Sequence, residues 1–293
     1  MTENKKSDTA FKTVVSADKK IFDLKLKEAF KYKDMILLFV KREFVSKYKQ
    51  TVLGPLWAII QPLFTTVVYT VIFGTLAGLD TADASPAPMV PSFLFYMSGT
   101  ILWSYFSSVV SATSHTFLAN AHIMGKVYFP RIAMPIATAI SNLISFGIQL
   151  AMFIVTYIVL IINGSAEFVL SWHLIFVPLS ILQLMLLSTG IGIIISALTT
   201  KYRDLSMLVG FGLNLWQYAT PVAYGLMLIP QNYIGLYHLN PVTPAILSFR
   251  YGVFGVGYFD LAYYLIGWAI TLLIAFLGLL LFNRIEKNFA DTV

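Results

Sequence analysis

The sequence contains no cysteine, and only 12% of its 293 residues are charged. The first absence excludes disulfide bonds, thiolate metal sites and cysteine nucleophiles. The second leaves too little polar surface to coat a water-soluble globule of this length, because 58% of the residues are hydrophobic and the mean hydropathy is +0.76. The composition therefore predicts a polytopic membrane protein.

Charge is absent from several long stretches, each long enough for the roughly 20 residues that a membrane-spanning helix requires. They predict an all-α integral membrane protein with six transmembrane helices. The expected spans are residues 55–78, 91–114, 132–162, 174–198, 207–228 and 261–282.

Lys and Arg residues set the expected orientation. All of them except Arg250 lie before the first span, between the second and third, between the fourth and fifth, or after the sixth. Because such residues collect on the cytoplasmic side, both termini are expected in the cytosol. The polar start of the chain lacks the apolar core of a cleaved signal peptide. We therefore divide the chain into a polar tail (1–20), a cytosolic interface helix (21–50) and a six-span domain (51–293).

Between residues 22 and 48, apolar residues recur at helical spacing with lysines between them, which predicts an amphipathic helix along the inner membrane surface. Gly54 and Pro55 then form an elbow, since glycine permits the turn and proline suits the first turn of the next helix. The cations at this interface are Lys41, Arg42, Lys47 and Lys49. Two interpretations stay open for them, an anchor for anionic lipid and an entry site for a phosphate headgroup.

Residues 229–260 are apolar but broken by prolines and glycines, and they are too few for two full crossings of about 40 residues. We expect a re-entrant pair of short helices that dips from the outer face and turns at Asn240 and Pro241. The alternative is an outer loop that lies in the membrane interface.

Several kinds of chemistry are missing. Gly125 and Lys126 are followed by Val127, so no phosphate-binding loop is present and the chain is not expected to hydrolyse nucleotide. The expected spans lack the ionic groups with which ion-coupled transporters work. The carboxylates are scattered, so neither catalytic residues nor an enzyme is expected, and nothing indicates a nucleic-acid partner. No metal site is expected, because the histidines lie on different segments: His115, His122, His173 and His238.

Aromatic residues are abundant, at 15% of the chain. Those on the first and fifth expected spans include Phe64, Tyr69, Phe73, Trp216, Tyr218 and Tyr224. Such rings commonly face lipid or form an interfacial belt. They also stack on the C–H faces of sugars, and a conduit for a glycan would use this lining.

Four blocks carry a family resemblance. They are YKQTVLGPLWAIIQP (48–62), NAHIMGKVYFPR (120–131), KYRDL (201–205) and LNPVTPAILSFR (239–250). Together they resemble the membrane subunits of ABC transporters that export O-antigen, teichoic acid or capsule polysaccharide. The resemblance covers residues 31–287 and leaves the first 20 residues without a role.

The resemblance implies a homodimer in the bacterial cytoplasmic (inner) membrane, with two ATPase subunits beneath it that bind ATP and Mg²⁺ in place of this chain. The implied substrate is a lipid-linked polysaccharide, O-antigen first, that enters on a polyprenyl pyrophosphate near Gly54 and Pro55. Spans one and five would line the channel, and the outer gate would include Asn240, Pro241 and Arg250. The ATPase contact would include Asn120, His122, Lys126, Tyr128 and Phe129.

Three rival functions stay open at this point. A related ABC permease for drugs or small lipids would share the six spans. An ion-coupled flippase would run on a proton or sodium gradient, and an integral-membrane transferase would act on lipid acceptors as an isolated chain.

Overall fold

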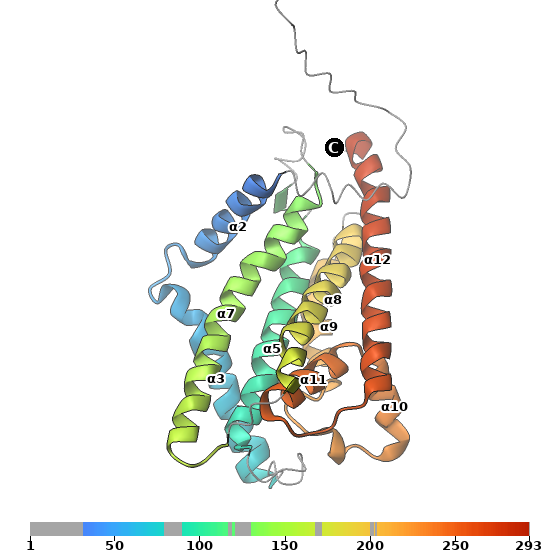
Figure 1. The fold of residues 1–293 in the computed structure, drawn as a ribbon. Coiled ribbons are helices and arrows are strands. Elements are labelled where there is room, and N and C mark those ends of the chain that lie inside the picture. Colours follow the sequence, from blue (N-terminus) through green and yellow to red (C-terminus); the bar gives the residue numbers. More distant parts are fainter. Residues whose placement is uncertain are drawn as a thin grey trace, which may run out of the picture.

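The computed structural model describes residues 32–78, 90–116, 119–120, 130–167, 172–199, 202 and 204–292, with side chains for all of these but 227 and 285–292. Helices are the regular elements of this part of the chain, and no strand occurs in it. The all-α prediction is confirmed. The helices form an elongated bundle, with α2 and the C-terminal end of α12 at one end and α10 and α11 at the other (Figure 1).

Five helical segments within the described residues are long and apolar enough to cross a membrane. They are Gly54–Leu76, Ser92–Ser114, Ala133–Ile162, Trp172–Thr199 and Leu261–Arg284. The first and last residues of each segment lie within two residues of the corresponding ends of an expected span. The prediction worked because an apolar run needs an element that satisfies its own backbone hydrogen bonds in lipid, and a helix does so.

These segments are built from the following elements. The first joins the 3₁₀ turn η1 (Gly54–Leu56), α3 (Trp57–Tyr69) and the π-helical η2 (Thr70–Leu76). The others are α5 (Ser92–Ser114), α7 (Ala133–Ile162), η3 (Trp172–Ile175) with α8 (Phe176–Thr199), and α12 (Leu261–Thr292).

The expected span at 207–228 is helical only in its first half. Helix α9 covers Leu205–Tyr218, about 21 Å of rise against a hydrocarbon core of about 30 Å. Pro221 disfavours helical geometry at the residue before it, and turns lead on to the short η4 (Leu226–Leu228). In Figure 1, α9 starts near the end of α8 and leads toward α10 and α11. A sixth crossing by α9 and these turns stays a prediction.

Two short helices follow, α10 (Gln231–Leu239) and α11 (Val242–Phe254), and they are separated at Asn240 and Pro241. Helix α11 ends at Gly255, whose φ of 68° is the left-handed conformation that favours glycine. The chain thus breaks at the expected place. The re-entrant path of this pair into a membrane stays a prediction.

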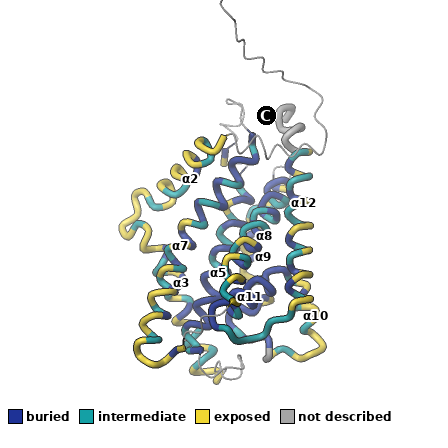
Figure 2. The backbone as a smooth tube through the Cα atoms, viewed as in Figure 1, coloured by how far each residue is buried: buried dark blue, intermediate teal, exposed yellow. Residues whose placement is uncertain are grey.

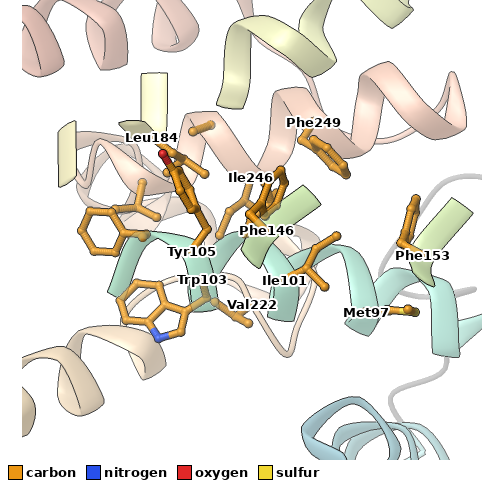
Figure 3. Packing of buried hydrophobic residues seen from close by; sticks show 14 of the residues in the cluster. Met97, Ile101, Trp103, Tyr105, Phe146, Phe153, Leu184, Val222, Ile246 and Phe249 are labelled. Carbon is orange, nitrogen blue, oxygen red and sulfur yellow. The ribbon is translucent and has the colours of Figure 1, made fainter. Parts of the chain in front are cut away.

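Helix α5 lies at the centre of the bundle (Figure 2). In its most apolar 18-residue window 78% of the residues are buried, against 11% for Gly54–Leu76 and 22% for Leu261–Arg284. Side chains of α5 meet those of α7, α8 and α11 in a continuous apolar core (Figure 3). The two peripheral segments therefore leave apolar faces for lipid or for another chain to cover.

Glycines allow α8 and α12 to approach closely. A Cβ at Gly278 would lie 2.8 Å from the carbonyl oxygen of Gly190, and a Cβ at Gly190 would lie 2.9 Å from the Cα of Ala275. Small residues at such contacts let backbones pack directly, which is how helices associate where lipid removes the hydrophobic driving force.

Helix α2 (Lys33–Tyr48) lies against the start of α7. Its buried apolar residues are Phe39 and Val40, whereas Leu37 is 60% exposed. Residues 22–31 of the expected interface helix lie outside the described residues. Its position along a membrane surface stays a prediction.

The link from α2 to α3 turns sharply. Gly54 has a φ of 52°, and Pro55 stands in the first turn of η1, as the expected elbow requires. Gln50 also has a positive φ of 65°, which is uncommon for a residue with a side chain. The chain therefore changes direction at Gln50 and again at Gly54, and only the turn at Gly54 was expected.

Candidate functional site

An open cavity of about 860 Å³ lies between α2, α5, α7 and α9. We call it the polar cleft. From α2 it is lined by Arg42, Glu43 and Lys47. Its other polar residues include Ser107, Ser108 and Ser111 on α5, Ser141 and Asn142 on α7, and Asn214 on α9. Hydroxyl, amide and cationic groups thus meet inside a bundle whose other surfaces are largely apolar.

The two cations of the polar cleft are tied to neighbouring amide groups. Arg42 Nη2 donates to Asn120 Oδ1 at 2.8 Å, and Lys47 Nζ donates to Asn142 Oδ1 at 3.3 Å. Guanidinium and ammonium groups have further N–H donors beyond these single bonds. The cleft can therefore offer charged donors to an anionic ligand.

Glu43 lies between these cations on α2, and Thr138 Oγ1 donates to its Oε1 at 2.8 Å. Burial raises the pKa of Glu43 above its ordinary value of 4.5, although the bond from Thr138 and the charge of Arg42 act in the opposite direction. The carboxyl group of Glu43 therefore keeps its proton to a higher pH than an exposed glutamate does.

The four cations predicted as a headgroup entry separate into two pairs. All four side chains are exposed, but Arg42 and Lys47 line the polar cleft, whereas Lys41 and Lys49 do not. Gly54 and Pro55 also lie outside the cleft lining, and the entry role of all six residues stays a prediction.

A smaller cavity of about 90 Å³ continues from the polar cleft toward α3. We call it the inner recess. It shares Lys47, Ser108 and Asn142 with the polar cleft. Its other lining residues include Tyr48, Trp57, Gln61, Ser104, Ser145 and Gln149. The two cavities together form one polar path between α5 and α7.

The aromatic residues of α3 and η2 do not share one face. Tyr69 and Phe73 are partly buried against the core, with ring centroids 5.6 Å apart, while Phe64 is 68% exposed. Gln217 Nε2 of α9 donates to Tyr69 Oη at 2.8 Å, so α3 and α9 meet near this tyrosine. Whether these rings line a channel stays a prediction.

The aromatic residues in and after α9 also differ in setting. Trp216 packs edge-on against Phe106 at 5.3 Å, whereas Tyr218 is 70% exposed. Tyr224 Oη donates to the carbonyl oxygen of Tyr218 at 2.8 Å, and its ring meets that of Tyr237. Trp216 and Tyr224 thus contact neighbouring aromatic rings, whereas the side chain of Tyr218 is exposed.

Asn240 joins α9 to the start of α11. Its Oδ1 accepts bonds from Trp216 Nε1 at 3.0 Å and from the amide N–H of Val242 at 3.2 Å. Its Nδ2 donates to Thr220 Oγ1 at 2.9 Å and to the carbonyl oxygen of Ala219 at 3.2 Å. One amide side chain therefore bonds both the residues that follow α9 and the first N–H of α11, with Pro241 buried beside it.

Arg250 is buried on α11. Its guanidinium donates to the carbonyl oxygens of Pro221 and Val222 at 2.8 Å, to that of Phe95 at 3.2 Å, and to Ser98 Oγ at 3.2 Å. It also lies 3.7 Å from the Phe95 ring centroid. No carboxylate is among its contacts in the described part of the chain. Arg250 therefore holds α5, α11 and the non-helical segment after α9 together.

The expected ATPase contact is described only at its beginning. Asn120 is 8% exposed, accepts the bond from Arg42 and donates through Nδ2 to the carbonyl oxygen of Thr116 at 3.0 Å. The other residues of this expected contact lie outside the described residues: His122, Lys126, Tyr128 and Phe129. What the structure adds is a direct bond between this segment and α2.

Sequence reasoning missed the neutral polar residues of the polar cleft and the inner recess. On α5 they are Ser104, Ser107, Ser108 and Ser111, and on α7 they are Asn142, Ser145 and Gln149. Their spacing of three or four residues puts each set on one helix face. That spacing was visible in the sequence, but single hydroxyl groups in an apolar helix commonly bond their own backbone, so only the packing identifies a shared wall.

Comparison with known proteins adds an independent observation. Residues 35–254 match the family model described as ABC-2 type transporter, a range that contains every residue of both cavities. The O-antigen export system permease protein RfbA of Klebsiella pneumoniae is 29% identical over 263 residues, covering 88% of this chain and 94% of the relative.

Two further relatives carry different names. The inner membrane transport permease YadH of Escherichia coli strain K12 is 26% identical over 226 residues, covering 72% of this chain and 86% of the relative. The polysialic acid transport protein KpsM of Escherichia coli is 26% identical over 260 residues, covering 84% and 91%. The similarity thus extends over most of the chain in each case.

Proposed function

This chain belongs to the ABC-2 type transporter family, and we propose that it is the membrane subunit of an ATP-driven exporter of lipid-linked polysaccharide. The resemblance found in the four sequence blocks is confirmed at the level of the family and of relatives named as O-antigen export permeases. The cargo would move from the cytoplasmic to the outer side of the bacterial inner membrane.

One observation carries the proposal beyond the family. The polar cleft, with two cations at its rim and hydroxyl and amide groups on its walls, lies in a bundle whose candidate spans have no ionic residue except Arg284 at the end of the last. A substrate that has an anionic linkage and many hydroxyl groups matches this lining. A purely apolar lipid or drug does not.

Energy for outward movement must come from outside the chain. The sequence has no phosphate-binding loop, and the candidate spans lack the ionic groups that couple ion gradients to transport. The energy source in this proposal is therefore a separate ATPase, and the family resemblance implies a homodimer of this chain with two ATPase subunits that bind ATP and Mg²⁺. Both termini would lie in the cytosol, in keeping with the common end that α2 and the end of α12 share.

O-antigen is the first choice of cargo, because relatives in two organisms are named for O-antigen export. A relative named for polysialic acid transport supports another polysaccharide as the alternative. In either case, Tyr69, Phe73 and Trp216 are candidates for ring surfaces along the path, and Asn240, Pro241 and Arg250 for the outer gate.

The proposal is tested by purification and reconstitution. The solubilised chain should co-purify with an ABC-type ATPase, and vesicles that hold the complex should move glycan only when ATP is supplied. Flux of glycan by the chain alone, driven by an ion gradient, would contradict the proposal. Stimulation of the ATPase by polysaccharide, and not by small lipids or drugs, separates this function from the rival ABC permease.

A further inference from the structure

The walls of the polar cleft and the inner recess together carry polar groups in two stripes, one on α5 and one on α7. Those on α5 are Ser104, Ser108 and Ser111, and those on α7 are Asn142, Ser145 and Gln149. At 1.5 Å of rise per residue each stripe is about 10 Å long. Lys47 lines both cavities, so the stripes begin at a cation and lead into the bundle.

Gln149 has a polar atom that the described part of the chain leaves without a partner. The side chain is 6% exposed, and its Nε2 reaches Ser104 Oγ only at 3.4 Å. Its Oε1 is buried and has no hydrogen-bond partner among the described residues. Buried polar atoms nearly always have a partner, and a polar cavity beside such an atom can supply one as water or as a ligand group.

Aromatic rings complete the chemistry of the recess. Tyr48 and Trp57 line it, and Tyr48 Oη is 2.9 Å from Ser145 Oγ. Aromatic faces pack on the apolar C–H surface of a sugar ring, while amides and hydroxyls bond its hydroxyl groups. A site for a simple anion would need only the two cations. The neutral hydroxyl, amide and aromatic groups beside them fit a ligand that also carries a sugar.

We propose that the polar cleft and inner recess bind a glycosyl phosphate, with the phosphate at Arg42 and Lys47 and the sugar against Ser108, Asn142 and Gln149. The two cations form charge-assisted bonds to phosphate oxygens. The amide of Gln149 then pairs with a sugar hydroxyl. The site deepens the proposed function and rests on it only for the source of the ligand, the reducing end of a lipid-linked glycan.

The test measures binding to the complex of this chain with its ATPase in lipid nanodiscs. The probes are short prenyl diphosphates, each carrying one hexose or N-acetylhexosamine, the bare prenyl diphosphate, and the water-soluble hexose 1-phosphates. The variant is Gln149→Met. The matched control is Gln183→Met on α8, because Gln183 is also buried with an unpartnered Oε1 among the described residues and lines neither cavity.

At least one sugar-bearing probe should bind more tightly than the bare prenyl diphosphate. Gln149→Met should remove that advantage, a loss of about tenfold, and Gln183→Met should keep it. If a hexose 1-phosphate binds comparably, the site is assigned to soluble sugar phosphates. If only the prenyl-linked probes bind, the site is assigned to the lipid-linked form. The site is overturned if no sugar improves binding, or if the advantage survives in Gln149→Met.

These outcomes are separable from failure of the proposed function. Thermal unfolding of each variant shows whether it folds, and rescue by Gln149→Asn, which retains the amide, separates bonding from packing. If glycan export depends on ATP but Gln149→Met binds every probe normally, the subsite is wrong and the function stands. If no glycan is exported while the sugar advantage depends on Gln149, the subsite stands and the function is wrong.

Discussion

Gly99 on α5 lies directly against the guanidinium of Arg250 on α11. A Cβ added at Gly99 would stand 2.5 Å from Arg250 Nη2 and 2.6 Å from the carbonyl oxygen of Val222. No side chain fits between α5 and the cation, so this glycine is what allows Arg250 to reach its backbone partners.

Gly99→Ala should therefore destabilise the protein. The added methyl group displaces the guanidinium or the Val222 backbone, and overpacking of this kind costs about 1–3 kcal/mol. Thermal unfolding of the detergent-solubilised chain measures the loss. Gly147→Ala on α7 is the control, since its Cβ would meet nothing within 4 Å. Equal melting temperatures for the two variants would contradict the account of Gly99.

Arg250→Met should be more damaging than Gly99→Ala. It leaves the carbonyl oxygens of Pro221 and Val222 without this donor, and an unpaired buried carbonyl costs about 1–3 kcal/mol. Arg250→Lys should rescue little, because one ammonium cannot span partners that a planar guanidinium reaches together. The yield of monodisperse protein and its melting temperature are the readouts, and full rescue by lysine would refute this reading of the contacts.

Glu43→Gln should change the pH dependence of stability. Burial raises the pKa of Glu43, so the folded chain binds this proton more tightly than the unfolded chain. The stability that the group contributes is complete below its ordinary pKa of 4.5 and is lost as the pH rises through the raised value. The amide still accepts from Thr138 but carries no charge. We expect Glu43→Gln to match the parent near pH 4.5 and to exceed it at neutral pH.

Melting temperatures across this pH range test the effect of Glu43. Asp34→Asn, at an exposed carboxylate in the first turn of the same helix, serves as the control. A Glu43→Gln variant that is less stable than the parent at neutral pH would show that the carboxylate charge stabilises α2 there.

Gly278→Ala should weaken the contact between α8 and α12. The new Cβ would lie 2.8 Å from the carbonyl oxygen of Gly190, and backbone cannot give way as a flexible side chain does. A cost of about 1–3 kcal/mol is expected. Gly212→Ala on α9, where a Cβ meets nothing within 4 Å, is the matched change. Thermal unfolding should separate the two variants.

The cations of α2 should differ in their effect on export. The double change Arg42→Gln with Lys47→Gln removes the charged rim of the polar cleft, at about 1 kcal/mol for each cation, and should weaken binding of the lipid-linked substrate by roughly 30-fold. Lys41→Gln with Lys49→Gln removes equal charge outside the cleft. Both double variants should insert into the membrane equally well. Equal export by the two variants would leave Arg42 and Lys47 with only an anchoring role.

Much of the fold could be read from the sequence because lipid imposes strong constraints. Charge-free runs located the five long segments, and the prolines near Asn240 located the break between α10 and α11. The early end of α9 was missed because hydropathy continues beyond Tyr218, although Pro221 was a visible stop signal.

The polar cleft was harder to predict because it depends on how α2 is rotated against α7. That Arg42 and Lys47 line the cleft while Lys41 and Lys49 do not follows from that rotation. Sequence spacing sets which residues share a face, but packing decides which face turns inward. The same limit applies to Gln149, whose unpartnered oxygen is a tertiary feature.

The bonds from Thr138 to Glu43 and from Lys47 to Asn142 both join positions 95 residues apart, so α2 and α7 run in the same direction in a fixed register. Neither helix can slide by one turn without breaking both bonds. Helix α7 has 30 residues and a length of about 45 Å, and these bonds attach α2 near its N-terminal end, at Thr138 and Asn142. Geometry then dictates that any tilt that α2 imposed on α7 as a rigid rod would displace its far end, at Ile162, more than the attached end.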